Sequence, residues 1–191
     1  QLEVLPSTVV ELRAQRLKLS GDIFDILDAQ RKGREQLFKP VQDLIQGNSL
    51  IREEYKLQFQ ATLAGSADSI ATALFTLIKQ NSGEFRGEDE SFSAIKKLAE
   101  EFDFNTKVGS LGFISGLHDK IIGAASGSSI SAVGIANLLR KDKTASDVYN
   151  LLFGLSFLEP RYSLLFQDTH IEQLSPGQLV PLLLIFYLFV D

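Results

Sequence analysis

The 191-residue chain contains no cysteine, no tryptophan and no methionine. Without cysteine it can form neither disulfide bonds nor thiolate zinc sites, and it carries no thiol nucleophile. This absence fits a reducing compartment, so we expect a cytoplasmic protein. The first residues, Gln1-Leu2-Glu3, lack the basic segment and apolar core of a secretory signal. The last apolar run is shorter than the roughly 20 residues of a membrane-spanning helix, so no membrane partner is expected.

Several catalytic and metal-binding motifs are also missing. The phosphate-binding loop G-x-x-x-x-G-K-[ST] needs a Gly-Lys pair, and the chain has none. The glycine- and serine-rich stretch 123–134 therefore predicts a surface loop. His118 and His170 lie far apart without cysteine partners, and no H-E-x-x-H motif occurs, so no metal site is predicted. The absence of G-x-S-x-G argues against a serine hydrolase.

Positive charge is in short supply. The formal net charge is -5 and the pI is about 5.1, which argues against a strong nucleic-acid binder, because phosphate neutralisation needs clustered Lys and Arg. One basic cluster, Arg140, Lys141 and Lys143, predicts a solvated surface turn, with a DNA contact as the alternative. The 45% hydrophobic and 23% charged fractions describe a globular chain with a real core.

A long helix is predicted at the N-terminal end. Pro6 and Ser7 favour a helix start, and apolar residues recur at steps of four and three residues through 8–46. These are Leu12, Leu19, Ile23, Ile26, Leu37 and Leu44. Pro40 predicts a kink or break. Residues 1–47 are then either an amphipathic helix packed on its own domain or the returning strand of a coiled-coil arm.

The remainder, 48–191, predicts a lobe of mixed structure. Alternating apolar and polar residues predict one half-buried strand, apolar residues at helical spacing predict four helices, and a strand-like composition predicts a second strand. They are a strand over 53–65, helices over 66–80, 91–102 and 111–122, a helix capped at Thr144 or Ser146, and a strand over 161–168 followed by a turn at Thr169-His170. The fold class is therefore α+β and mostly helical, with a long N-terminal helix and a few antiparallel strands.

The stretch from His170 onward, HIEQLSPGQLVPLLLIFYLFVD, joins a turn to an apolar run. Ser175-Pro176-Gly177-Gln178 suit a helix start better than a helix interior. Residues 179–190 are apolar nearly all round, which predicts a buried helix. A helix start presents unpaired N–H groups and a positive dipole end, and both favour an anion such as phosphate.

The motif LSPGQ at 174–178 resembles the signature motif of ATP-binding-cassette (ABC) ATPases. That motif is a hydrophobic residue, Ser, a small residue, Gly, then Gln or Glu. The wider run FLEPRYSLLFQDTHIEQLSPGQ…LLLIFYLFVD looks more specifically like the large AAA-like ATPases of the SMC/RecF type. In them a long coiled-coil insertion separates the Walker A half of the head from the signature half. The resemblance is good over 151–191 and only architectural before that.

This resemblance implies a site that acts in trans, because two such heads sandwich ATP. Ser175 would donate its hydroxyl to a γ-phosphate oxygen and Gly177 its backbone N–H, while Gln178 would contact the nucleotide or stabilise the turn. The implied partners are a second head in a homodimer, the preceding coiled-coil strand and the Walker A lobe of the same protein. DNA is a partner implied for the parent protein, in DNA repair, DNA processing or anti-phage defence.

ATP and Mg²⁺ are implied for the intact parent protein only. The chain lacks the Walker A loop and the Walker B carboxylates, which cradle the phosphates, bind the metal and activate water. We therefore expect the isolated chain to hold no cofactor and to hydrolyse no ATP, although its parent would be an ATP hydrolase. The alternative is a non-catalytic helical protein–protein interaction domain, in which 174–178 is an ordinary turn.

Overall fold

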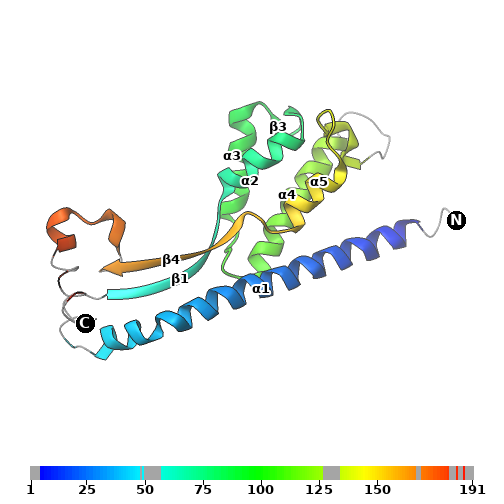
Figure 1. Cartoon of the computed structure of the whole chain (residues 1–191). Coiled ribbons are helices and arrows are strands. Elements are labelled where there is room, and N and C mark those ends of the chain that lie inside the picture. The colour runs from blue at the N-terminus through cyan, green and yellow to red at the C-terminus, as the bar shows by residue number, and fades with distance from the viewer. Residues whose placement is uncertain are drawn as a thin grey trace. The chain divides into compact units, whose positions relative to one another are not determined.

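The computed structural model describes residues 5–47, 49, 57–126, 134–166, 169–180, 184 and 187. As predicted, the chain is mostly helical, with a long N-terminal helix and a few antiparallel strands (Figure 1). It packs as two compact units, one formed by 1–27 with 64–159 and the other by 28–63 with 160–191. This division runs through the long helix, so it leaves the two segments inferred from the sequence, 1–47 and 48–191, as a prediction.

The first unit is helical and carries one small hairpin. It contains the first part of α1 (Leu5–Gly47), then α2 (Ala67–Leu77), β2 (Asn81–Ser82), β3 (Phe85–Arg86), α3 (Glu88–Glu100), α4 (Lys107–Ser126), the 3-10 helix η2 (Gly134–Leu138) and α5 (Ala145–Phe153). Strands β2 and β3 pair antiparallel, with Ser82 opposite Phe85. Gly83 turns this hairpin at a φ of 56°, and an added Cβ would lie 2.9 Å from the Ala124 Cα. A side chain at position 83 would therefore be strained and would clash.

Phenylalanine rings form much of the core of this unit. Phe113 on α4 is fully buried and lies 5.1 Å from Phe104, 5.3 Å from Phe157 and 6.5 Å from Phe102, between ring centroids. All three pairs are edge-to-face, the arrangement that the ring quadrupole favours. Phe113 thus ties α4 to the segment that precedes it and to the segment that follows α5.

Helix caps confirm two of the predicted helix starts. The Ser66 hydroxyl accepts a hydrogen bond from Ser69 N at 3.1 Å at the start of α2. At α5 Thr144 is the N-cap, and it forms a capping box with Asp147. The Thr144 backbone N–H and hydroxyl both donate to the carboxylate, which lowers the Asp147 pKa.

Two other helix starts were predicted too late in the chain. Helix α3 begins at Glu88 after an N-cap at Gly87, and Ser91, the first residue of the predicted helix, is buried with its hydroxyl donating to Gly87 O. Acidic residues fill that first turn, where the helix dipole favours them. Helix α4 begins at Lys107 rather than at the predicted 111, because the Thr106 hydroxyl accepts a hydrogen bond from Gly109 N at 3.0 Å and caps the helix.

The predicted surface loop at 123–134 is also corrected in part. Residues 123–126 continue α4, and Gly134 opens η2. Residues 127–133 lie outside the described residues.

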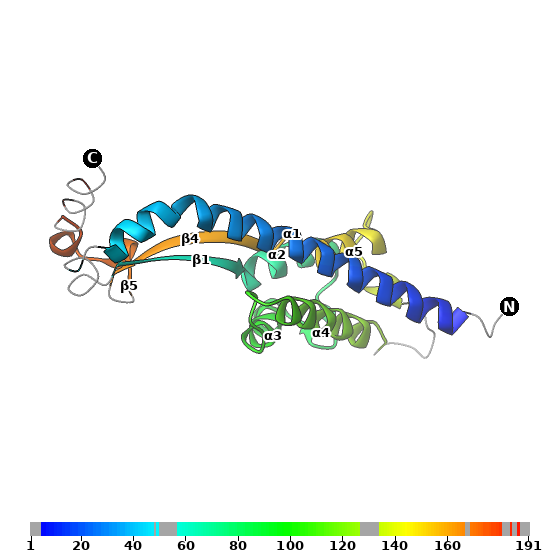
Figure 2. The ribbon, with the colours of Figure 1, turned by 90° about the horizontal axis from the view of Figure 1, so that it is seen from below.

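The second unit contains the later part of α1 and a three-stranded sheet. Its strands are β1 (Leu57–Gly65), β4 (Leu158–Phe166) and β5 (Thr169–His170) in the order β1-β4-β5, followed by the 3-10 helix η3 (Ile171–Gln173). Both views show β1 and β4 running in opposite directions alongside the C-terminal half of α1 (Figures 1 and 2). The turn predicted at Thr169-His170 is wrong, because both residues pair antiparallel with the end of β4.

Helix α1 does not break at Pro40 but continues to Gly47. Just before the proline, the Phe38 ring stacks on Phe59 of β1 with centroids 4.5 Å apart. Phe59 in turn stacks on Tyr162 of β4 at 6.2 Å. These contacts hold the helix against the strands just before the position where the proline removes a donor.

Candidate functional site

Ser175, Gly177 and Gln178 come together in the second unit, where a helical segment covers 176–180. The backbone N and the hydroxyl of Ser175 both donate to Gln178 Oε1, at 3.1 and 2.9 Å. The backbone N–H groups of Gln178 and Leu179 donate to Ser175 O at 2.9 and 3.0 Å. Ser175 is therefore an N-cap and Gln178 its N3 partner, so the helix starts three residues earlier than the sequence predicts.

The turn presents its hydrogen-bond donors to solvent. Ser175, Gly177 and Gln178 are all exposed, and an added Cβ at Gly177 would meet nothing within 4 Å. Among the described residues no backbone acceptor takes the Gly177 N–H. Since Gln178 Oε1 is used inside the turn, the amide NH₂ remains to donate. Donors at the positive end of a helical segment are suited to an oxyanion.

The apolar run after the turn is not buried where its side chains are described. Val180 is 64% exposed, Leu184 59% and Tyr187 73%. The prediction of a buried helix over 179–190 is therefore wrong for these three residues, because the described part of the chain does not cover them. The other positions from 181 to 191 lie outside the described residues.

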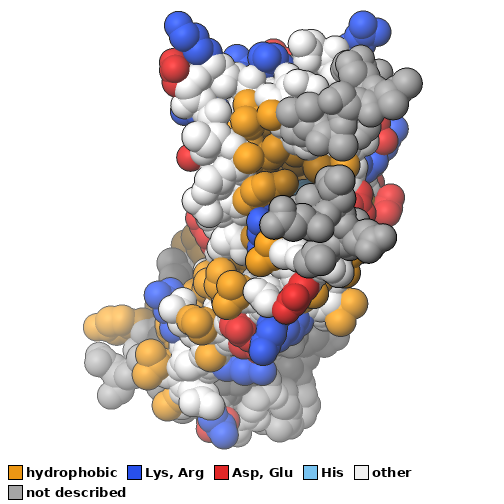
Figure 3. All heavy atoms as spheres, turned by 90° about the vertical axis from the view of Figure 1, so that its right-hand side faces the viewer, with side chains coloured by type: hydrophobic (Ala, Val, Ile, Leu, Met, Phe, Trp, Pro, Cys, Tyr) orange, Lys and Arg blue, Asp and Glu red, His pale blue; other side chains and the backbone are white. Residues whose placement is uncertain are grey.

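The apolar stripe of α1 is also exposed over much of its length. Leu12, Leu19, Ile26 and Leu37 are 54%, 62%, 59% and 76% exposed, Ile23 is half-buried, and the side chain of Leu44 lies outside the described residues. The opposite side of the helix is the one that packs, with Phe24 and Ser20 buried and the Ser20 hydroxyl donating to Phe153 O at 2.8 Å. Seen from the N-terminal end of α1, hydrophobic side chains reach the surface beside Lys and Arg side chains (Figure 3). Heptad spacing and exposure together describe a helix face open to a partner.

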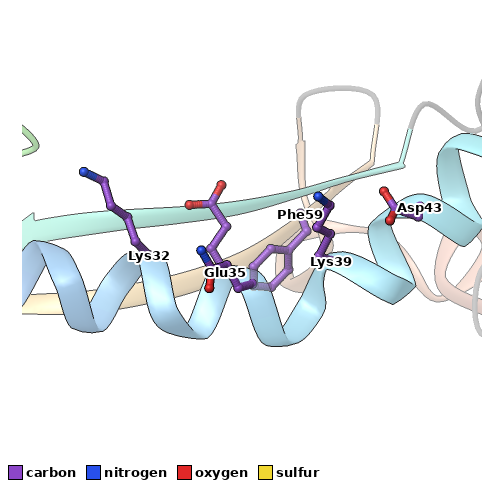
Figure 4. A pocket seen from close by; sticks show the side chains of 6 residues that line it. Lys32, Glu35, Lys39, Asp43 and Phe59 are labelled. Carbon is purple, nitrogen blue, oxygen red and sulfur yellow. The ribbon is translucent and has the colours of Figure 1, made fainter.

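Between α1 and β1 lies a cavity of about 400 Å³. The Phe59 ring reaches from β1 toward the helix, along which Lys32, Glu35 and Lys39 are spread, with Asp43 further on (Figure 4). Two cations and two carboxylates line it, so it has no net preference for an anion. Lys32 is moreover held by Asp28 at 2.7 Å, and that hydrogen bond is the main reason why the Asp28 pKa is lowered.

The basic cluster is partly structural. The Arg140 guanidinium donates to Ile78 O at 2.9 Å, and its backbone N donates to Leu77 O at 2.9 Å. Lys141 and Lys143 are exposed, as a surface turn predicts. Two lysines alone would neutralise too few phosphates for strong DNA binding.

Within the described ranges, no group of three His, Asp or Glu side chains could hold a metal ion. No helix in that part of the chain is both long enough and apolar enough to cross a membrane. No protein-family model matches the chain, and neither a curated protein nor a solved structure does.

Proposed function

We propose that the chain is the signature half of the head of an ABC-type ATPase of the SMC/RecF kind, with part of its coiled-coil arm. The observation that carries this proposal is the exposed helix start at 174–178, in which Ser175, Gly177 and Gln178 form one donor-rich turn. The residue types match the ABC signature, and the exposure leaves the turn accessible to a second head.

In this proposal the partner head holds ATP, and the turn at 174–178 binds the γ-phosphate of that ATP. The Ser175 hydroxyl rotates from Gln178 Oε1 to a phosphate oxygen, while the Ser175 backbone N keeps the turn in place. The Gly177 N–H donates to the same group, and the absence of a side chain lets the phosphate approach. Each hydrogen bond to a charged group contributes roughly 1.5–3 kcal/mol, enough to couple nucleotide binding to head dimerisation.

ATP binding therefore closes the two heads, and hydrolysis opens them again when the γ-phosphate leaves. The Walker A lobe and the Walker B carboxylates of the parent protein hold ATP and Mg²⁺ and activate water. The arm transmits the movement. Its exposed stripe on α1 supports this role, because a preceding coiled-coil strand would cover Leu12, Leu19 and Ile26.

By the same resemblance the parent protein acts in DNA repair, DNA processing or anti-phage defence in the cytoplasm. This chain would contribute head closure to that activity. Its net charge of -5 makes it a poor surface for DNA, so we assign DNA binding to other parts of the parent.

The test is Ser175→Arg in the full-length protein. A bulky cation at an exposed turn should leave folding and ATP affinity of the same head unchanged, but abolish dimerisation with a non-hydrolysable ATP analogue and abolish turnover. Ser146→Arg is the matched control, because Ser146 is an exposed serine in the first turn of α5. Wild-type dimerisation and turnover in Ser175→Arg would leave the turn without a nucleotide role.

A second candidate is a helical protein–protein interaction domain. The exposed apolar side chains of α1, and those of Val180, Leu184 and Tyr187, favour a partner that buries them. This function needs no nucleotide. It is favoured over the first if substitutions at Ser175 have no effect while substitutions at Leu19 and Ile26 abolish partner binding.

A further inference from the structure

Three helices of the first unit enclose a second, smaller cavity of about 160 Å³. Its polar lining comes from Arg13 and Arg16 on α1 and from Ser115, His118 and Asp119 on α4, and α5 closes it with Phe153. No sequence motif joins these residues, because they come from three separate segments.

Positive charge dominates the cavity. The Arg16 guanidinium lies 4.1 Å from the centroid of the Tyr149 ring and 5.2 Å from that of Phe153, which fixes its position. No carboxylate of the described residues lies within ion-pair distance of Arg13 or Arg16. The only acidic side chain in the lining, Asp119, is itself 84% exposed.

His118 is the buried polar group of this cavity, at 7% exposure. Its nearest described charge partner is Asp119, 3.8 Å from Nδ1, which is too far for a hydrogen bond. Burial lowers the His118 pKa, the charges of Arg13 and Arg16 lower it further, and Asp119 opposes them. A neutral imidazole can donate from one nitrogen and accept at the other, so the ring is able to bind a ligand that does both.

We propose that this cavity binds one phosphate group, as free phosphate or as a phosphate monoester, between Arg13, Arg16 and His118. Guanidinium groups match the geometry of oxyanions, and the Ser115 hydroxyl adds a donor. The volume suits one tetrahedral oxyanion, whereas pockets for drug-sized ligands start at about 300 Å³. Near neutral pH inorganic phosphate keeps a P–OH group, which can donate a hydrogen bond to the Asp119 carboxylate. Sulfate has no O–H group and cannot make this bond.

This proposal does not depend on the ATPase assignment, since it uses only residues of α1, α4 and α5. The two can fail separately. Loss of head dimerisation in Ser175→Arg says nothing about this cavity, and phosphate binding here says nothing about the signature turn.

The experiment is histidine NMR on the 191-residue chain. The chain has two histidines, so the imidazole C–H signals give one reporter in the cavity, His118, and one internal control, His170. Inorganic phosphate is titrated against sulfate, acetate and chloride at equal ionic strength. O-phosphoserine and methyl phosphate are then compared with inorganic phosphate to separate a monoester ligand from free phosphate.

The expected result is a saturable shift of the His118 signal with phosphate and a raised His118 pKa, because a bound anion stabilises the imidazolium. The His170 signal should not move. Arg13→Gln should weaken phosphate binding by at least roughly tenfold, the loss of one charge-assisted contact. Arg13 is exposed, so the fold should be kept, and the exposed Arg86→Gln on β3 is the matched control.

Four results would overturn the proposal. One is a His118 signal that phosphate moves no more than chloride does. Another is equal shifts of His118 and His170, which would report ionic strength alone. The third is unchanged phosphate affinity in Arg13→Gln. Tighter binding of acetate than of phosphate would also reject it and would assign the cavity to a carboxylate.

Discussion

Ser175 and Gln178 are joined twice, because the backbone N and the hydroxyl of Ser175 share the acceptor Gln178 Oε1, at 3.1 and 2.9 Å. The backbone bond holds the start of the helical segment, whereas the hydroxyl is free to exchange its acceptor for a ligand oxygen. Under the proposed function, Gln178 shapes the turn and the Ser175 hydroxyl binds the ligand, so the two residues have separate roles three positions apart.

The isolated chain is expected neither to hydrolyse ATP nor to bind it tightly. It has no Gly-Lys phosphate loop, and under the proposed function the turn at 174–178 contacts phosphate only when another lobe holds the nucleotide. Phosphate release and nucleotide titration on the purified chain check this. Turnover above background that Ser175→Ala removes would place a complete site within these residues.

The exposed stripe of α1 is expected to make the isolated chain associate. Leu19 and Ile26 are 62% and 59% exposed, and burying such a side chain contributes about 1.5–3 kcal/mol. Leu19→Glu with Ile26→Glu should therefore weaken self-association by at least roughly tenfold, without loss of stability. Sedimentation velocity over a range of concentrations measures it.

The matched control for the stripe is Val108→Glu, which changes an equally apolar residue that is 83% exposed on α4. It should leave association unchanged. A wild-type chain that is monomeric at all concentrations would contradict the arm assignment.

Phe113 should be among the most sensitive core positions. It is fully buried and contacts three other phenylalanine rings. Phe113→Ala should lower the free energy of unfolding of the first unit by about 3–5 kcal/mol, because it removes apolar contacts and leaves a cavity. Urea unfolding measures the change, and a loss below about 1 kcal/mol would mean that the ring cluster does not hold this unit together.

The stability of the chain should rise with pH just below 6.5. The His118 pKa lies below its ordinary value of 6.5, mainly through burial, so in that window the unfolded chain binds more protons than the folded one. The stabilisation from neutral His118 is present above pH 6.5 and is lost as the pH falls toward the folded-state pKa. The free energy of unfolding of His118→Gln, measured at several pH values, should lack this slope. An equal slope in the variant would contradict a buried, neutral His118.

Local patterns predicted the elements but not always their ends. Alternation in β1 matches the exposure of Gln58 and Gln60 and the partial burial of Phe59 and Ala61, because a strand has a period of two. In α1, residues at steps of three and four fall on one face of the helix, and most of those that the structure describes are exposed. The start of α3 was missed because Ser91 is a good cap by residue type, yet it is buried and hydrogen-bonded inside the first turn.

Features that need distant partners could not be predicted from the sequence. The sequence predicts no strand between the helices over 66–80 and 91–102, yet β2 and β3 form a hairpin there in which Phe85 is fully buried. Burial of the run after the turn was predicted from its apolar composition alone, but whether such a run is covered depends on which surfaces are present. The cavity at His118 needed α1, α4 and α5 to meet, and it left no signal in the sequence.

The most direct test of the central claim is a mixing experiment with the full-length protein. Two variants are purified, Ser175→Arg and one without the Walker A lysine, and each is expected to be inactive alone. Mixed dimers would join the intact signature of one variant to the intact Walker A loop of the other. ATP turnover should therefore reappear on mixing, with about a quarter of the wild-type number of sites, because half of the dimers are mixed and each has one intact site. Wild-type turnover of Ser175→Arg alone, or a mixture as inactive as its components, would contradict a signature turn that acts in trans.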